Sequence, residues 1–197
     1  NAIGDQNNPF LTIDYAMGMI YPTEDNPVTI HLTAGEFSPT INNEVFPIYM
    51  KSNVNLIGEG DELTILNAEG SEENQRNVMN LIECENNIIS GLTIKGGITG
   101  ARGGGMRVIN SNPQLINILI TENTAAYSGG GIYLAYSNAT LIHATIAGNI
   151  ANISGAPRTV PGGRNREGGV VDLEVLAEVR AGAFRRVPGT MRVFTLS

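Results

Sequence analysis

A small mixed group of polar side chains is the best candidate for chemistry in this 197-residue sequence. Glu83, Arg107 and Tyr133 supply a carboxylate, a guanidinium and a phenol, which together could bind a polar substrate or move a proton. If the chain stacks copies of one unit, the three residues fall on neighbouring rungs of one face. The alternative is an ordinary solvated strand face, because charged residues on a sheet exterior are expected anyway. This group leaves the question of catalysis open.

Tyrosines and one histidine form a second set of candidates. Tyr127, Tyr133 and Tyr136 lie in the outward phase of the pattern described below, and the chain has no Trp. Aromatic rings on a flat β face can stack on sugar rings, whereas corner tyrosines in solenoids more often cover neighbouring Gly backbone. His143 takes the place of Asn117 in the preceding copy, and positions that vary between copies are the better place to look for function.

Isolated reactive residues and glycine-rich loops carry less weight. His31 lies on the outward phase of a strand with no second His or Cys near it, which indicates an ordinary exposed histidine. Cys84 is the single cysteine and stands beside apolar residues, which indicates a buried small side chain without a disulfide. The triple glycines at 103–105 and 129–131 are not followed by Lys-Ser or Lys-Thr, so corners are favoured over a phosphate loop. We expect no metal and no cofactor.

A repeat of 26 residues supplies the elements that would position these side chains. Residues 103–128 and 129–154 match without a gap, and residues 88–94 fall over residues 114–120 at the same offset. A fixed period in this range is typical of a solenoid, in which no copy can bury its apolar face alone. The matched positions are Gly103/Gly129, Gly104/Gly130, Gly105/Gly131, Ser111/Ser137, Asn112/Asn138, Leu115/Leu141, Ile116/Ile142, Ile120/Ile146, Asn123/Asn149, Ala125/Ala151 and Ser128/Ser154.

The pattern inside each copy predicts short parallel strands. Apolar residues alternate, as at Met106 and Val108, and turns recur every eight to ten residues, which fits a β-solenoid better than a helical repeat. Each side chain should then lie about 4.8 Å above its equivalent in the coil below. The recurring Asn residues 86, 112 and 138, and 123 and 149, are expected at corners as amide ladders with left-handed backbone. Apolar residues at helical spacing within residues 7–20 predict one amino-terminal helix.

The two copies GGGMRVINSNPQLINILITEN and GGGIYLAYSNATLIHATIAGN resemble the right-handed parallel β-helix proteins of the pectin-lyase-like superfamily. The closest likeness is to secreted and surface repeat proteins with Gly-Gly-x-Ile and apolar-x-x-Asn corners, here Gly130-Gly131-Ile132 and Ile146-Ala147-Gly148-Asn149. The openings at residues 8–13 and 28–37 are similar to the cap and first coil of such proteins. The resemblance covers residues 1–154 and implies an all-β, right-handed parallel β-helix of about five coils, with an amino-terminal helical cap and an irregular carboxy-terminal segment.

The same resemblance specifies the fold better than the activity, because this solenoid carries lyases, hydrolases, adhesins and inert stalks. Its polysaccharide-cutting enzymes generally present clustered or paired Asp, and between Asp61 and Asp172 this chain has none. The first hypothesis is therefore a non-catalytic secreted or cell-surface module that binds polysaccharide or acts as a structural or adhesive repeat. The alternative is a polysaccharide lyase or glycoside hydrolase that uses the face of Glu83, Arg107 and Tyr133.

The repeat stops at residue 154, and residues 155–197 form a different segment. The formal charge is −10 before the break (five basic against fifteen acidic residues) and +3 after it (seven Arg against four acidic residues). A cap, an oligomerisation element or sequence from another reading frame are the open alternatives. The alternation in residues 170–187 favours strands, and a truncated solenoid exposes strand edges that need cover. We expect a homo-oligomer formed through this end.

Charge and hydropathy exclude several classes of partner. A net charge of −7 argues against nucleic acid, which requires a basic stripe, and no apolar run is long enough to cross a bilayer as a helix. The sequence begins without a basic leader region, so we expect that any export signal is absent from this chain.

Overall fold

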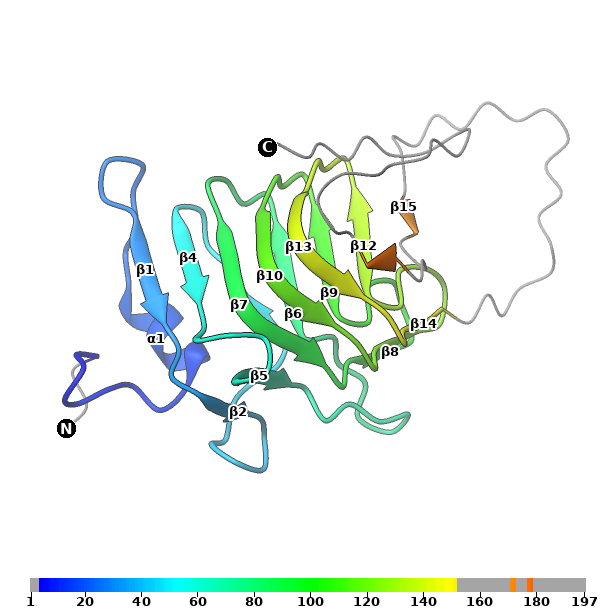
Figure 1. Ribbon diagram of the computed structural model, residues 1–197, viewed down its shortest axis with the longest axis horizontal. Coiled ribbons are helices and arrows are strands. Elements are labelled where there is room, and N and C mark those ends of the chain that lie inside the picture. Colours follow the sequence, from blue (N-terminus) through cyan, green and yellow to red (C-terminus); the bar gives the residue numbers. More distant parts are fainter. Residues whose placement is uncertain (1–3, 152–170, 173–176, 179–197) are drawn as a thin grey trace, which may run out of the picture.

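The structure is a computed structural model that describes residues 4–151, 171–172 and 177–178 of the chain. Short parallel strands stack into a solenoid with one short helix at its amino-terminal end (Figure 1). Five successive strands of the longest sheet, β1, β4, β7, β10 and β13, mark about five turns. The all-β stacked architecture and the helical cap predicted from the sequence are confirmed, and the right hand of the coil stays a prediction.

Three sheets run along the solenoid. The helix α1 spans Ile13–Met19. The first sheet contains β1 (Val28–His31), β2 (Gly35–Phe37), β4 (Val54–Ile57), β5 (Thr64–Asn67), β7 (Ile88–Lys95), β10 (Gln114–Ile120), β13 (Thr140–Ile146) and β16 (Ala177–Glu178). The second sheet contains β3 (Ile48–Tyr49), β6 (Met79–Ile82), β9 (Met106–Ile109), β12 (Ile132–Ala135) and β15 (Val171–Asp172). The third sheet contains β8 (Ile98–Thr99), β11 (Thr124–Ala125) and β14 (Ile150–Ala151).

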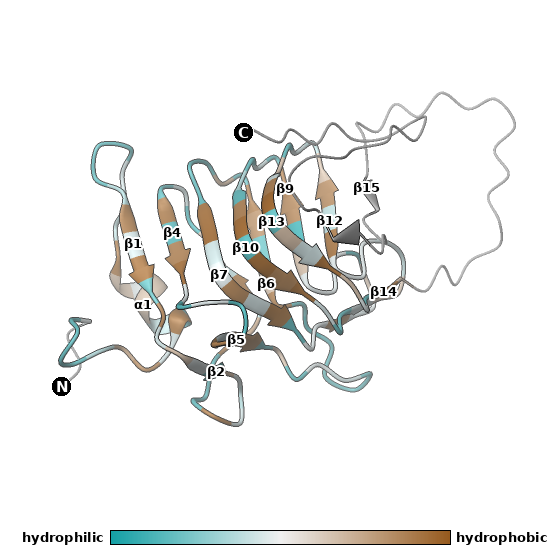
Figure 2. Cartoon of the chain, viewed as in Figure 1, coloured by the Kyte–Doolittle hydropathy of each residue, from teal (hydrophilic) through white to brown (hydrophobic). Residues whose placement is uncertain are grey.

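The register of the strands reproduces the 26-residue period. Gln114 of β10 lies between Ile88 of β7 and Thr140 of β13, and Arg107 of β9 lies beside Tyr133 of β12. The inward residues then form continuous apolar columns, as at Leu56, Ile89, Leu115 and Leu141. Each of these is at most 3% exposed, and Figure 2 shows hydrophobic residues recurring along successive strands. Burial of such columns is the main driving force for the fold.

The long strands of the first sheet bend at one position per coil. Gly91, Asn117 and His143 occupy this position with φ of 64°, 49° and 49°. Left-handed backbone is tolerated best by Gly and next by residues such as Asn and His, which explains the residue types found there. A Cβ added to Gly91 would lie 2.6 Å from the carbonyl oxygen of Gly58, so this copy of the bend requires glycine.

The glycine triplets form a second corner, as predicted. The backbone N–H groups of Gly103, Gly104 and Gly105 donate to carbonyl oxygens of the next coil at 3.0 Å each. A Cβ on Gly104 would lie 2.5 Å from the carbonyl oxygen of Gly130 and 2.7 Å from that of Thr124. These glycines are therefore required by close backbone approach between coils rather than by a ligand.

A buried asparagine ladder joins the later coils. The N–H and Nδ2 of Asn123 both donate to Oδ1 of Asn149, at 3.1 and 3.0 Å, and Oδ1 of Asn123 accepts from the N–H of Gly97 at 2.9 Å. Asn123 is fully buried, and its amide also donates to Ile94 and Thr121 carbonyls. The predicted ladder is confirmed, but its residues point inward, and neither has the left-handed backbone expected for a corner asparagine.

The second predicted asparagine ladder forms only in part. Nδ2 of Asn86 donates to Oδ1 of Asn53, and the N–H of Asn138 donates to Oδ1 of Asn112. Asn86 has the expected positive φ, and so do Asn110 and Asn117, which the sequence analysis did not assign to corners. A serine ladder lies beside this corner, where the N–H of Ser111 donates to Oγ of Ser137.

Cys84 takes the place of serine one coil earlier. Its N–H donates to Oγ of Ser111 at 2.9 Å, and its thiol lies 3.2 Å from the carbonyl oxygen of Met50 and 3.4 Å from that of Ile82. The prediction of a buried small side chain is confirmed, because Cys84 is 4% exposed. Burial also raises the pKa of the thiol, which disfavours the reactive thiolate.

Two charged residues of the first coil clamp the amino-terminal helix. The carboxylate of Glu44 accepts the N–H groups of Ile13 and Asp14 at 2.7 and 3.0 Å. The ammonium of Lys51 donates to the carbonyl oxygens of Met17 and Ile20 at 2.6 and 3.2 Å. A negative group at the helix amino terminus and a positive group at its carboxyl terminus both oppose the helix dipole, so the clamp stabilises α1 at each end.

Two short strands from the segment after residue 155 pair with the last coils. β15 pairs antiparallel with β12, and β16 pairs antiparallel with β13. Strands are thus confirmed for residues 171–172 and 177–178, where the alternation favoured them. Residues 173–176 and 179–197 lie outside the described part of the chain. The boundary at residue 154 stays a prediction.

Candidate functional site

The outer face of the second sheet carries the candidate site. Tyr49, Asn80, Arg107 and Tyr133 are neighbours in the parallel register of β3, β6, β9 and β12. We call these four residues the outer column. Their neighbours along each strand, such as Met79, Met106 and Ile132, point into the core and are fully buried. Alternation along the strands therefore turns the outer column away from the core.

The two ends of the outer column differ in exposure. Tyr49 is 61% exposed, and Arg107 is also exposed. Asn80 and Tyr133 are only 6% and 7% exposed, although their positions face outward. The prediction of an exposed Tyr133 was therefore wrong, while Tyr127 and Tyr136 are exposed as predicted, at 54% and 60%.

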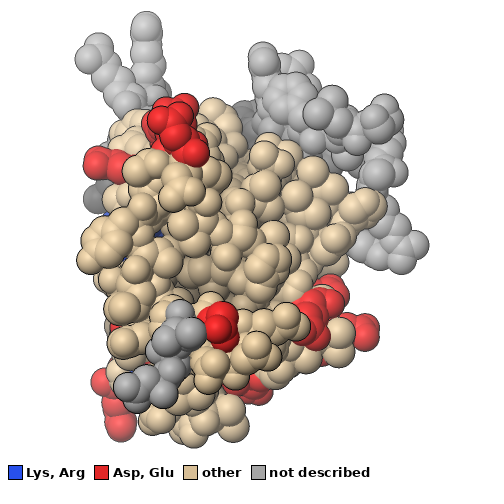
Figure 3. All heavy atoms as spheres, turned by 90° about the vertical axis from the view of Figure 1, so that its left-hand side faces the viewer, with Lys and Arg blue, Asp and Glu red and all other residues tan. Residues whose placement is uncertain are grey.

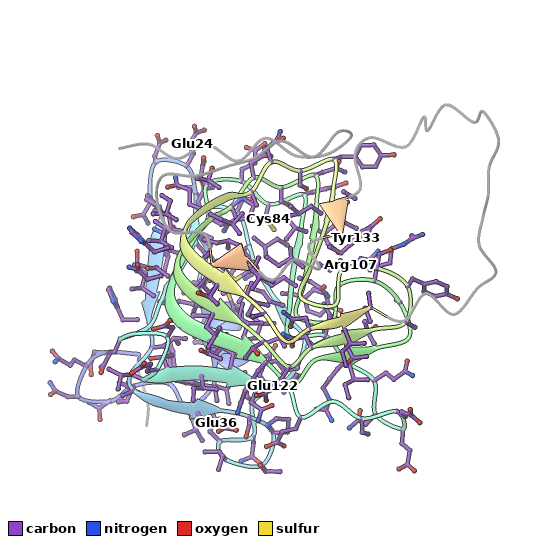
Figure 4. The ribbon with its side chains drawn as sticks, turned by 45° about the vertical axis from the view of Figure 1, so that its right-hand side comes forward. Glu24, Glu36, Cys84, Arg107, Glu122 and Tyr133 are labelled. Carbon is purple, nitrogen blue, oxygen red and sulfur yellow. The ribbon has the colours of Figure 1, made fainter. Side chains whose placement is uncertain are left out.

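Arg102 is one reason for the burial of Tyr133. The guanidinium carbon of Arg102 lies over the Tyr133 ring, 5.5 Å from its centroid, in a cation–π contact. β12 is also paired with β15 at this residue, with Tyr133 opposite Asp172. Figure 4 shows Tyr133 and Arg107 next to each other beside β15, and Glu36 and Glu122 away from them. Tyr133 therefore supports a local basic surface rather than offering a free ring.

Asn80 is held in place from its own strand. Nδ2 of Asn77 donates to Oδ1 of Asn80 and, at 3.2 Å, to the carbonyl oxygen of Met79. The amide nitrogen of Asn80 is thereby oriented away from Asn77. Next to the outer column, Ile82, Ile109 and Ala135 form a parallel apolar column. Ile82 is 42% exposed and adds apolar surface beside the polar groups.

Glu83 does not join the outer column, which corrects the predicted grouping. It follows β6 at a corner, with φ of 55°, and its N–H donates to the carbonyl oxygen of Ile109. Asn110 and Tyr136 occupy the same corner in the next two coils, with φ of 48° and 53°. The three-residue offset from Asn80 to Glu83 carries the chain past the end of the strand. Arg107 and Tyr133 are neighbours as predicted, and Glu83 is not part of their column.

His143 lies on another sheet and is exposed, at the bend of β13. It therefore does not belong to the site formed by the second sheet. His31 is exposed on β1 of the first sheet, as predicted. Tyr136, at the corner beyond β12, is the exposed aromatic residue nearest in sequence to the outer column on that coil.

Sequence analysis missed Tyr49, Asn80 and Arg102. The offset is 31 residues from Tyr49 to Asn80 and 27 from Asn80 to Arg107, so neither pair appears at the 26-residue period. The insertion at residues 69–77 shifts the frame between these coils. Alternation on each strand, followed from Arg107 back through Leu81 and Met79, could have found Asn80. No pattern in the sequence indicated the contact between Arg102 and Tyr133.

The outer column combines an exposed phenol, two amide groups and two guanidinium groups close by. These groups can stack on a ring and donate hydrogen bonds, but the column itself contains no carboxylate. Within residues 4–151, no group of three or more His, Cys, Asp or Glu could hold a metal ion. Over the same described residues, no helix is long and apolar enough to cross a membrane.

Comparison with known proteins identifies a family. The family described as "Protein of unknown function (DUF1565)" matches residues 1–174. The chain belongs to this family. No curated protein and no solved structure matches the chain. The family match spans the five turns and extends past the last repeat into β15, and membership of the pectin-lyase-like superfamily stays a prediction.

Proposed function

We propose that the protein is a non-catalytic, secreted or cell-surface β-solenoid module that binds polysaccharide along the outer face of its second sheet. The supporting observation is the outer column, where exposed Tyr49 and Arg107 flank the fixed amide of Asn80. Arg102 lies nearby, against Tyr133. Residues on adjacent strands are about 4.8 Å apart, so the column offers an extended line of contacts to an extended chain.

The chemistry of these groups fits a sugar polymer. A tyrosine ring offers an apolar face with a polar tip, and amide and guanidinium groups donate hydrogen bonds to hydroxyl or carboxylate oxygens. The strands that carry them are fixed by parallel hydrogen bonds and by a fully buried core, so little freedom is lost on binding. This preorganisation favours recognition by many weak contacts along the sheet.

Catalysis as a lyase or hydrolase is the less favoured alternative. Glycoside hydrolases need two carboxyl groups about 5–10 Å apart, and the outer column contains none. Glu83, which was the carboxylate of the predicted group, lies at a corner in register with Asn110 and Tyr136. The geometry therefore supports binding better than bond cleavage.

The test is binding of the full chain to a glycan array, followed by titration calorimetry with the glycans that bind. We expect Tyr49→Ala and Arg107→Ala each to weaken binding by about tenfold, while His31→Ala on the first sheet leaves it unchanged. Binding that survives both column variants would place the site elsewhere. Release of reducing or unsaturated sugar that disappears in Arg107→Ala would overturn the proposal in favour of the enzyme.

A further inference from the structure

The amino-terminal end of the solenoid exposes an apolar surface that we call the cap face. Leu11, Tyr15 and Met19 recur every four residues on the side of α1 that faces away from the coils, and are 68%, 54% and 52% exposed. Their neighbours Ile13, Ala16 and Met17 are buried beneath the helix. The cap helix is therefore apolar on both sides, whereas a helix that only seals a core needs a polar outer side.

Contacts between the elements join further apolar residues to this stripe. Nδ2 of Asn42 donates to the carbonyl oxygen of Leu11 at 2.8 Å, which brings exposed Ile41 next to the start of the helix. Glu44 binds the first N–H groups of α1, and the next residue, Val45, is 55% exposed. Tyr21, which is 85% exposed, lies under the ammonium of Lys51 at the other end of the helix. A joined patch of this kind is unusual on a monomer and indicates an interaction surface.

The surroundings of the cap face define the charge of its partner. Residues 4–50 contain six acidic residues and no Lys or Arg. Lys51 is the first basic residue of the chain, and its ammonium is bonded to the carbonyl end of α1. Figure 3, which views this end of the molecule, shows a broad uncharged surface with acidic residues around its edges. A complementary partner combines apolar side chains with positive charge.

We propose that residues 179–197 of a second copy of this chain bind the cap face, so that copies associate head to tail. This segment is the part of the chain with the required chemistry. It contains four Arg and no Asp or Glu, and it includes Phe184, Met191, Phe194 and Leu196. Its charge of +4 matches the acidic edge of the cap face, and its apolar residues match the exposed stripe on α1.

The strand pairing at the other end of the solenoid supports this direction of association. β16 ends at Glu178 and is paired with β13 of the last turn, so residue 179 starts at the carboxy-terminal end of the stack. The cap face lies at the opposite end, at α1 (Figure 1). A head-to-tail neighbour would place its cap face beside the start of this segment. The contact is heterologous, so it builds chains of molecules rather than a closed symmetric dimer.

The proposal is tested by mixing two variants of the full chain in sedimentation velocity experiments. The cap variant carries Leu11→Ser and Tyr15→Ser, and the tail variant carries Arg185→Glu and Arg186→Glu. We expect the unmodified chain to form concentration-dependent oligomers and each variant alone to weaken association by about tenfold or more. A mixture should form a dimer and stop, because the intact tail of one variant meets the intact cap face of the other.

Two control variants match these substitutions. Tyr127→Ser removes an exposed tyrosine outside the cap face, and Arg164→Glu with Arg166→Glu changes the charge equally outside residues 179–197. Both should associate like the unmodified chain, and thermal melting confirms that each variant is folded. Oligomers that persist in the tail variant alone would overturn the proposal in favour of contact between two cap faces. A monomeric unmodified chain at all concentrations would also overturn it.

Discussion

The first two coils and the last three reach the same cross-section by different means. In the last three, the register repeats every 26 residues and each corner uses one residue type, as at Gly104 and Gly130 or Ser111 and Ser137. In the first two, offsets of 31 and 33 residues separate neighbouring strands, and charged residues hold the helix that covers the core. Repetition is therefore sufficient for stacking in the middle, whereas the end needs residues that occur once.

The glycine corner should show the largest effect within the repeated coils. Gly104→Ala places a Cβ 2.5 Å from a backbone oxygen of the next coil, so the coils must separate. We expect the free energy of unfolding to fall by about 3 kcal/mol or more, measured by chemical denaturation. Gly18→Ala in α1 is the matched control, because nothing lies within 4 Å of its Cβ position. That variant should gain about 0.5–1 kcal/mol, and equal losses at both sites would contradict the steric explanation.

The buried asparagine ladder should come next. Asn123→Ala leaves the N–H of Gly97 and the carbonyl oxygens of Ile94 and Thr121 without their side-chain partner. We expect a loss of about 2–3 kcal/mol in unfolding free energy. Asn149→Ala, one coil later and half-buried, should lose less. A larger loss at Asn149 would show that burial does not set the strength of this ladder.

The helix clamp of the first coil should show a pH dependence that the repeated coils lack. Burial is the main cause that raises the pKa of Glu44 above 4.5, and the hydrogen bonds from Ile13, Asp14 and Val45 oppose it. A carboxyl group with a raised pKa in the folded state binds its proton more tightly than the unfolded chain does. Its contribution to stability is therefore greatest below its unfolded pKa and is lost as pH rises through the raised folded pKa.

Glu44→Gln isolates this contribution. The amide cannot ionise and has one acceptor oxygen in place of two, so the variant should be less stable than the unmodified chain at acidic pH by about 1–2 kcal/mol. The difference in unfolding free energy should shrink as pH rises above about 4.5. Denaturation of both proteins across this range measures it. A difference that grows with pH would mean that the ionised carboxylate is the favoured form.

Cys84 should show the smallest effect, because it replaces a repeated serine without changing the geometry. Cys84→Ser retains a donor for the carbonyl oxygens of Met50 and Ile82, so we expect a change within about 1 kcal/mol. Cys84→Val has no donor and should lose more. Labelling with a thiol reagent should be slow in the folded chain, because the thiol is buried and its pKa is raised. Rapid labelling under native conditions would contradict this description.

The candidate site was predicted less completely than the fold. Register at the 26-residue period brought Arg107 and Tyr133 together correctly, because β9 and β12 are separated by one unbroken repeat. It placed Glu83 wrongly, because the strand β6 ends one residue earlier and the backbone turns there. Tyr49 was missed because insertions shift its coil, and the burial of Tyr133 depends on Arg102, which comes from a loop of the coil before.

The sequence by itself determined the solenoid, the position of its corners and the helical cap. Periodic apolar residues and glycines leave few other ways to bury the core, and these signals are local and repeated. The tertiary structure decided which outward residues share a column and how the ends are held. Glu44 and Lys51 find the two ends of α1 from about thirty residues away in the chain. Such pairings occur once and have no period, so only the folded coils reveal them.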